Sequence, residues 1–234
     1  MLEATVKKIL QARVYEAACE TPISPAPFLS RRFNNQILIK REDLQPVFSF
    51  KIRGAYNKMA QLTDEQKAKG VIAASAGNHA QGLAMAAKLM GVKAVIVMPR
   101  ITPDIKVQAV RARGAKVVLK GDAFAAAAEH AQELINEHGY TYIPPFDDID
   151  VVAGQGTIGV EILRQHGGRL DAIFIPRRRR WPDCRRGSLR KVPASRHQKS
   201  SAWKPRIAPV SKPLWRPASA WCWIRSVSLP KALR

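Results

Sequence analysis

Residues 71–90 read VIAASAGNHAQGLAMAAKLM and contain a complete strand–turn–helix unit. The apolar run Val71–Ala74 suits a short buried strand, Ser75–Gly77 interrupts it, and Asn78–Met90 has the apolar spacing of a helix. Gly91 then supplies the usual helix stop. A strand followed at once by a helix is the repeating unit of α/β proteins, so this stretch predicts a parallel sheet.

The same alternation of short Val- and Ile-rich runs with longer helical patterns continues from about Gln36 to Pro176. We predict strands at Ile37–Lys40, Val71–Ala74, Ala94–Met98, Lys116–Leu119, Thr141–Ile143 and Ala172–Ile175. We predict helices at Ile52–Leu62, Asn78–Met90, Pro103–Ala112, Ala123–Glu137 and Gln155–Gln165. This order indicates an α/β fold with a mainly parallel sheet.

Composition divides the 234-residue chain in two. Residues 177–234 hold 17 of the 39 Lys and Arg but one of the 18 acidic residues, which leaves 22 basic and 17 acidic residues in 1–176. All five tryptophans also lie after Pro176, where neither the helical nor the strand period continues. We therefore expect an ordered region at 1–176 and an irregular or disordered basic tail at 177–234.

Bulk features also exclude several classes of protein. The sequence has no uninterrupted apolar run of 18 residues and no apolar leader, which predicts a cytoplasmic protein without a membrane partner. Cys19, Cys184 and Cys222 lack metal-ligand spacing, so neither a metal site nor a disulfide is expected. The total charge of +21 would suit nucleic acid, but its concentration in the tail argues against that partner.

A second informative stretch, residues 40–56, reads KREDLQPVFSFKIRGAY. It places Lys51 at the start of a predicted helix, flanked by the apolar side chains of Phe48, Phe50 and Ile52. A single lysine is usually a solvated surface charge. A partly desolvated amine, however, suits Schiff-base chemistry, so Lys51 is a candidate catalytic residue.

The turn after the strand at 71–74 is a candidate anion site. Its backbone N–H groups and the positive end of the following helix dipole suit a carboxylate or a phosphate. An ordinary helix cap would explain Ser75 or Asn78 alone. It explains less readily a turn that combines Ser, Gly, Asn, His and Gln.

A third stretch, Gly154–Gly159, reads GQGTIG and formally matches the dinucleotide-binding fingerprint. The acidic segment before it does not resemble the buried strand that the fingerprint requires. We expect Gly154 and Gly156 to shape the start of a helix instead.

Four segments in this order and spacing resemble successive motifs of threonine dehydratases: Lys40–Tyr56, Ser75–Gly82, Pro144–Asp147 and Gly154–Thr157. The resemblance covers Val14 to Pro176. It implies the pyridoxal-phosphate (PLP) fold type II of the tryptophan-synthase-β kind, with two α/β lobes. It also implies that 1–176 is an incomplete PLP-dependent catalytic domain, truncated where the non-homologous tail begins.

The resemblance assigns the cofactor-binding residues. Lys51 is implied to form the Schiff base with pyridoxal 5'-phosphate, Phe50 to pack beside its ring, and Asn78 to hydrogen-bond its 3′-oxygen. The substrate carboxylate is implied to bind Ser75, Gly77 and His79.

The implied reaction deaminates L-threonine to 2-oxobutanoate and ammonia, the first step of isoleucine biosynthesis, and the family forms homo-oligomers. Serine racemase or serine dehydratase is a rival, because these enzymes share the motifs and act on serine. A rival from another class is an inactive scaffold with a basic, nucleic-acid-binding tail.

The resemblance breaks after Pro176. The family continues with Val-Gly-Gly-Gly-Gly-Leu, a loop whose backbone cradles the cofactor phosphate, whereas this chain has Arg177–Arg180, Trp181 and Pro182. Read one base early, valine and glycine codons (GTN, GGN) become NGT and NGG triplets, of which CGT and CGG encode arginine. We hypothesise a frameshift near codon 176 and expect the 234-residue product to be impaired.

Overall fold

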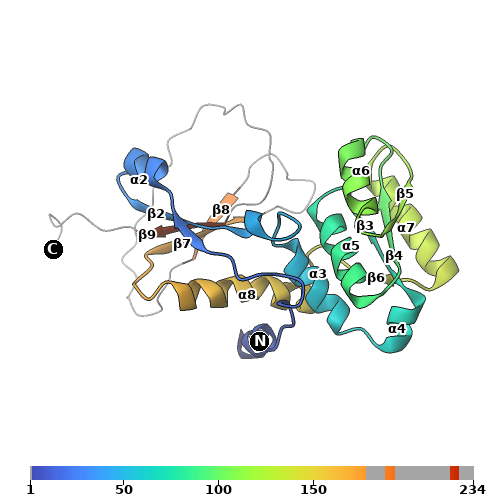
Figure 1. The fold of residues 1–234 in the computed structure, drawn as a ribbon, viewed down its shortest axis with the longest axis horizontal. Helices are drawn as coiled ribbons and strands as arrows, with labels where there is room; N and C mark the ends of the chain where they lie inside the picture. Colours follow the sequence, from blue (N-terminus) through green and yellow to red (C-terminus); the bar gives the residue numbers. More distant parts are fainter. Residues whose placement is uncertain (1, 178–187, 193–221, 227–234) are drawn as a thin grey trace. The chain divides into compact units, whose positions relative to one another are not determined.

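The computed structural model describes residues 2–177, 188–192 and 222–226 (Figure 1). It divides into two compact units. Unit 1 comprises Met1–Pro22 and Glu42–Gln165, and unit 2 comprises Ile23–Arg41 and His166–Arg234. The boundary at residue 176 stays a prediction, because it separates two compositions and the compact units follow contacts.

Unit 1 contains η1 (Glu42–Leu44), the helices α1 (Leu2–Leu10), α3 (Lys51–Ala60), α4 (Asp64–Lys69), α5 (Asn78–Met90), α6 (Asp104–Arg111), α7 (Phe124–His138) and α8 (Ile149–Gln165), and the strands β3 (Val71–Ala74), β4 (Ala94–Met98), β5 (Lys116–Leu119) and β6 (Thr141–Tyr142). Unit 2 contains β1 (Ile23–Pro25), α2 (Pro27–Phe33), β2 (Gln36–Lys40), β7 (Ala172–Arg177), β8 (Ser188–Val192) and β9 (Cys222–Ser226). All the predicted strands and helices are present.

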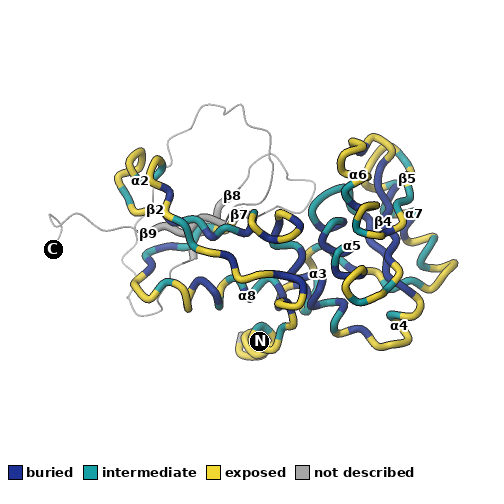
Figure 2. The backbone as a smooth tube through the Cα atoms, in the orientation of Figure 1, coloured by how far each residue is buried: buried dark blue, intermediate teal, exposed yellow. Residues whose placement is uncertain are grey.

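The sheet of unit 1 confirms the predicted parallel arrangement. Its order is β5-β4-β3-β6, and all of its strand pairs are parallel. Figure 2 shows β3 and β4 as buried, and every residue of these two strands is buried. Strands covered on both faces read as continuous apolar runs, which is why VIAA and AVIVM lack polar alternation.

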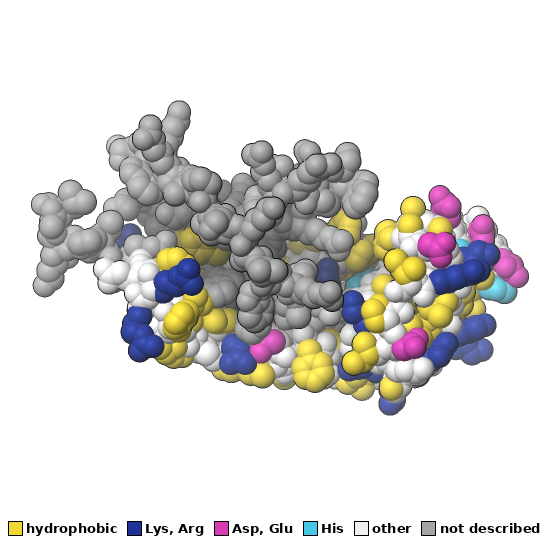
Figure 3. Space-filling view, turned by 90° about the horizontal axis from the view of Figure 1, so that it is seen from above, with side chains coloured by type: hydrophobic (Ala, Val, Ile, Leu, Met, Phe, Trp, Pro, Cys, Tyr) yellow, Lys and Arg dark blue, Asp and Glu magenta, His cyan; other side chains and the backbone are white. Residues whose placement is uncertain are grey.

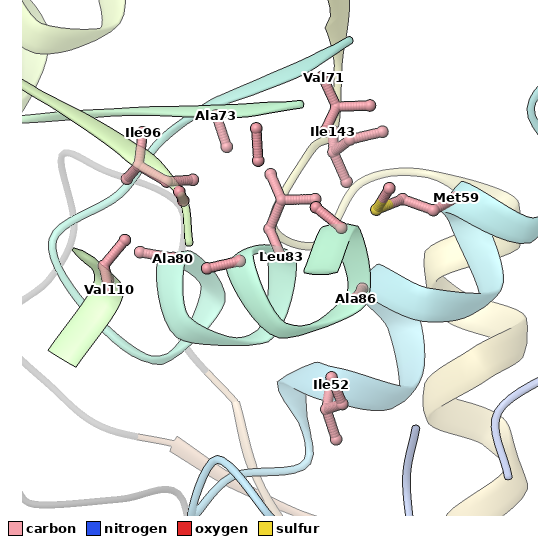
Figure 4. Packing of buried hydrophobic residues seen from close by; sticks show 14 of the residues in the cluster. Ile52, Met59, Val71, Ala73, Ala80, Leu83, Ala86, Ile96, Val110 and Ile143 are labelled. Carbon is pink, nitrogen blue, oxygen red and sulfur yellow. The ribbon is translucent and has the colours of Figure 1, made fainter. Parts of the chain in front are cut away.

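The alternation along β3 and β4 distributes their side chains to two helical layers. One layer packs α3, α5 and α6 against Val71, Ala73 and Ile96, as Figure 4 shows around Leu83. The other packs α7 against Ile72 and Val95. The larger core lies in the first layer and holds the N-terminal ends of α3 and α5.

Unit 2 differs from the expected parallel sheet. Its order is β1-β2-β9-β7-β8, and each of its pairs is antiparallel. Strand β9 pairs with both β2 and β7. These two strands, which were predicted from the sequence, therefore run in the same direction on either side of β9.

The tail was predicted to be irregular. This prediction is wrong for Ser188–Val192 and Cys222–Ser226, because extended backbone can pair with an open strand edge without any side-chain period. The rest of the tail, including Arg178–Arg180, lies outside the described residues.

Helix α8 also differs from the prediction. It begins at Ile149, six residues before the expected start, so Gly154 and Gly156 lie inside the helix. A Cβ at Gly154 would lie 2.6 Å from the carbonyl oxygen of Arg53 and 2.8 Å from the Cα of Gly54. Gly154 therefore allows α8 to approach α3, whereas a Cβ at Gly156 would lie 2.5 Å from the side chain of Ile9 in α1. Neither glycine shapes a helix start, so that prediction is wrong.

Candidate active site

Lys51 is the first residue of α3, and its side chain is directed to the segment before α8. Its Nζ donates a hydrogen bond to the carbonyl oxygen of Pro145 at 2.5 Å, and lies 5.3 Å from the centre of the Phe50 ring. The residue is half-buried. The partial desolvation that we predicted for this amine is thus confirmed, with Phe50 beside it as expected.

One part of the predicted apolar surroundings is wrong. Phe48 is 68% exposed and has a left-handed backbone conformation with a φ of 55°. That conformation turns the chain between η1 and α3. Phe50, half-buried, supplies the apolar surface beside the Lys51 amine, whereas Ile52 is fully buried in the hydrophobic core.

The helix α5 approaches Lys51 through a glycine. A Cβ at Gly82 would lie 3.1 Å from the carbonyl carbon of Lys51 and 3.1 Å from the amide nitrogen of Ile52. Asn78 precedes Gly82 by four residues, which places both on the same face of α5. The structure therefore brings the amine-bearing end of α3 next to the first turn of α5, where the candidate anion site lies.

The Ser75–Asn78 turn links buried β3 to α5, and its residues are half-buried. Gly77 precedes the first residue of the helix and offers no capping side chain, while its own N–H donates to Ser75 Oγ at 3.4 Å. A Cβ at Gly77 would meet nothing within 4 Å. Open space therefore adjoins this turn, as an anion at the helix N-terminus requires.

His79 is buried, with 4% of its surface exposed. Its Nε2 lies 2.9 Å from the carbonyl oxygen of Ile143, so Nε2 carries the proton and donates, while its Nδ1 has no hydrogen-bond partner. Burial lowers the pKa of His79 to about 4, against the opposing effect of the bond to Ile143, and the positive charge of Lys51 lowers it further. The imidazole is therefore neutral at pH 7.

Lys51 and His79 are held by carbonyls of the same segment, Ile143–Pro145. The sequence offered one indirect signal of this segment, because Pro144–Asp147 is one of the four motifs. The carbonyl contacts themselves were missed, since any residue can supply a backbone carbonyl.

These residues fit one end of the PLP molecule. A half-buried amine beside an aromatic ring, next to a helix N-terminus that borders open space, suits an aldehyde and an anionic oxygen. The sequence does not supply the glycine loop expected for the phosphate end of PLP. Its longest glycine run is Gly167–Gly168, and Arg177–Arg180 replace the expected cradle. The roles of Lys51, Phe50, Asn78, Ser75, Gly77 and His79 stay predictions.

The chain matches the family of pyridoxal-phosphate-dependent enzymes over residues 14–177 and belongs to that family. Within it, the chain is 57% identical over 174 residues to the biosynthetic L-threonine dehydratase IlvA of Burkholderia multivorans, covering 73% of this chain and 34% of that protein. It is 57% identical over 168 residues to the chloroplastic threonine dehydratase of Arabidopsis thaliana, covering 72% and 28%. The chain thus spans about a third of the length of these relatives.

Solved structures of threonine deaminase and serine racemase are also similar to this chain. Threonine deaminase isoform 2 from Solanum lycopersicum has a TM-score of 0.69 at 54% identity, covering 70% of this chain and 46% of that one. Maize serine racemase has a TM-score of 0.68 at 33% identity, covering 71% and 51%. This similarity confirms the predicted α/β fold of type II. Among the described residues, no helix is both long and apolar enough to span a bilayer.

Proposed function

We propose that this chain carries the lysine-bearing part of a PLP-dependent threonine dehydratase, which deaminates L-threonine to 2-oxobutanoate and ammonia in isoleucine biosynthesis. The observation that carries the proposal is the position of Lys51, whose backbone touches Gly82 one turn after Asn78. The high identity to biosynthetic threonine dehydratases supports the reaction and the threonine substrate.

Three residues would hold the cofactor. Lys51 would bond its aldehyde carbon, Phe50 would pack beside its ring, and Asn78 would donate to its 3′-oxygen. When bound, PLP supplies the electron sink that permits loss of the α-proton and the β-hydroxyl group. Lys51 would also move the proton at the α-carbon, as the family resemblance implies.

The substrate carboxylate would bind the turn that precedes α5. Ser75 would contribute its hydroxyl and His79 its backbone N–H. Gly77 would contribute its backbone N–H by giving up the long 3.4 Å bond to Ser75 Oγ. The His79 side chain is not available as a donor, because its protonated Nε2 already donates to Ile143. A neutral Nδ1 lone pair would repel a carboxylate, which favours the backbone contact.

Reductive trapping tests the proposal. The 234-residue protein is incubated with PLP, reduced with borohydride, digested and analysed by mass spectrometry. We expect the label on Lys51 in preference to exposed lysines such as Lys69, and no label at this position in Lys51→Ala. Lys58→Gln, in the same helix, is the matched control and should label as the wild type does. Labelling that spreads over surface lysines without preference for Lys51 would contradict the proposal.

Serine racemase is the second candidate, because maize serine racemase shares the fold at 33% identity. The identity of 54% to a threonine deaminase of known structure favours threonine. A frame-restored protein supplied with L-threonine and L-serine should form 2-oxobutanoate faster than pyruvate, without D-serine. Racemisation of serine as the main reaction would reverse this order.

The homo-oligomer and the cytoplasmic location are further parts of the proposal. The names of relatives include chloroplastic and mitochondrial enzymes, so fractionation of the source cells is the measurement for location. Figure 3 shows basic and acidic side chains intermixed on the surface of the part that carries the four-stranded sheet. This mixture gives no support to nucleic-acid binding by that part of the surface.

A further inference from the structure

Arg53 lies two residues after Lys51 and is completely buried. Its Nε and Nη2 donate to the carboxylate of Glu42 at 2.8 and 2.9 Å, and its Nη1 and Nη2 donate to the carboxylate of Glu161 at 2.5 and 3.0 Å. Thr157 Oγ1 and the Cys19 carbonyl accept further bonds, each at 3.1 Å. The guanidinium thus spans two carboxylates, and we name this arrangement the Glu42–Arg53–Glu161 bridge.

Both carboxylates of the bridge have additional donors. Glu42 accepts hydrogen bonds from the Thr21 hydroxyl at 2.6 Å and the Gln45 amide at 3.1 Å. Glu161 accepts one from the Tyr15 hydroxyl at 2.9 Å. Burial alone would lower the pKa of Arg53, but its bonds to Glu42 and Glu161 raise the pKa above the ordinary value. The bridge is therefore ionic and its geometry is fully specified.

The bridge joins the segments that define the position of the Lys51 amine. Glu42 lies in η1, at the start of the stretch that leads into Lys51. Glu161 lies in α8, the helix that follows Pro145, whose carbonyl binds Nζ. Arg53 itself lies in the first turn of α3. A shift of any of these three segments would move either the amine or its acceptor.

We propose that Arg53 is a positioning residue for Lys51, which acts by fixing α3 to η1 and α8 through the Glu42–Arg53–Glu161 bridge. The inference rests on the proposed function, because it requires Lys51 to be the reactive amine. A buried ion pair adds little net stability compared with well-packed apolar residues. The planar guanidinium, however, fixes direction as well as distance through its paired bonds, which apolar contacts do not.

The test separates position from stability by replacing the whole bridge. The triple variant Arg53→Met, Glu42→Leu, Glu161→Leu removes all three charges together and leaves no unpaired one. Arg53→Lys keeps the charge but loses the planar fork. Arg13→Met is the matched control, because Arg13 forms an exposed ion pair with Glu16. For each full-length protein, we would measure the thermal midpoint, the rate of PLP trapping at Lys51, and the circular dichroism of the bound PLP.

We expect the triple variant to stay folded with a somewhat lower thermal midpoint, because the Thr21 and Tyr15 hydroxyls lose their carboxylate acceptors. It should label Lys51 about tenfold more slowly and lose the PLP dichroism, because small displacements of a reacting group cost large factors in rate. The labelling rate and dichroism of Arg53→Lys should lie between those of the triple variant and those of the wild type. Arg13→Met should match the wild type in both measurements. A folded triple variant with wild-type labelling and dichroism would overturn the positioning role.

If the triple variant does not fold, Arg53→Lys decides, and wild-type labelling in that folded variant would overturn the inference. Failure of the wild type to label Lys51 is a different result. It would overturn the proposed function, and the positioning role with it.

Discussion

The backbone of Lys51 lies against Gly82, so closely that a Cβ at position 82 would be 3.1 Å from the Lys51 carbonyl carbon and 3.2 Å from its oxygen. Contacts of this length require a shift of a few tenths of an ångström. Gly82 therefore sets the distance between the amine-bearing end of α3 and the helix that begins at Asn78. The candidate site depends on an absent side chain as much as on the side chains that it contains.

Gly82→Ala should displace α3 from α5. We expect a loss of about 1–3 kcal/mol of stability from overpacking and slower PLP trapping at Lys51. Gly77→Ala is the matched control for stability, because its φ of −139° suits any residue and its Cβ would meet nothing within 4 Å. Urea unfolding of both variants makes the comparison. Equal stabilities of Gly82→Ala and the wild type would show that α3 and α5 are not in this contact.

A second glycine pair predicts the behaviour of the α3–α8 contact. Gly154→Ala should destabilise the protein by about 1–3 kcal/mol, because its Cβ would collide with backbone atoms of α3. Gly159→Ala lies in the same helix, is exposed and meets nothing, so it should stabilise by about 0.5–1 kcal/mol through helix propensity. Opposite signs in thermal unfolding are the expected result. The same sign for both would contradict the close approach of α8 to Arg53.

The parallel sheet could be predicted from sequence, because β3 and β4 are buried on both faces and therefore read as unbroken apolar runs. The start of α8 could not be predicted, because its glycines are required by tertiary contacts and not by the local backbone conformation. Gly154 permits a helix contact, whereas the same residue in an isolated sequence indicates a turn. The strands β8 and β9 were missed because a strand that pairs with open edges needs no period of its own.

The candidate site was partly predictable. Lys51 and the turn at 75–79 were identified by residue type and order, and the structure brings them together. Phe48 was misplaced, because its left-handed backbone cannot be deduced from its neighbours. The carbonyls of Ile143 and Pro145 have no side-chain signature, and only the folded chain reveals that they hold His79 and Lys51.

His79 predicts a pH dependence of stability. Its pKa is lowered to about 4 in the folded protein, against 6.5 as the ordinary value. Between these values the unfolded chain binds the proton more tightly than the folded protein does. The contribution of His79 to the free energy of unfolding is therefore complete above pH 6.5 and is lost as the pH falls towards 4. The loss amounts to about 3 kcal/mol at most. Urea unfolding between pH 8 and pH 4 should show it in the wild type.

His79→Gln should unfold with a weaker dependence on pH over the same range, whereas the exposed His138→Gln should retain the dependence of the wild type. If His79→Gln and the wild type lose stability in parallel, the buried imidazole is not the titrating group.

The residues after Pro176 predict a loss of activity in the 234-residue protein. A phosphate group held by about three charged hydrogen bonds gains on the order of 5 kcal/mol, which corresponds to more than a thousandfold in affinity. Arg177–Arg180 carry charge, but their Cβ atoms prevent the close backbone approach that glycine allows. The 234-residue protein should therefore show negligible dehydratase activity with PLP and threonine.

A gene with the reading frame restored near codon 176 should gain the glycine loop and form 2-oxobutanoate, and Lys51→Ala in that background should abolish the reaction. Sequencing of the coding DNA supplies an independent check, because a frameshift requires an alternative frame that encodes Val-Gly-Gly-Gly-Gly-Leu after Pro176. Turnover by the unrestored chain at the rate of the restored one would show that arginines can replace the glycine cradle. That result would leave Lys51 in place as the reactive amine but would remove the physical reason for the loss of activity.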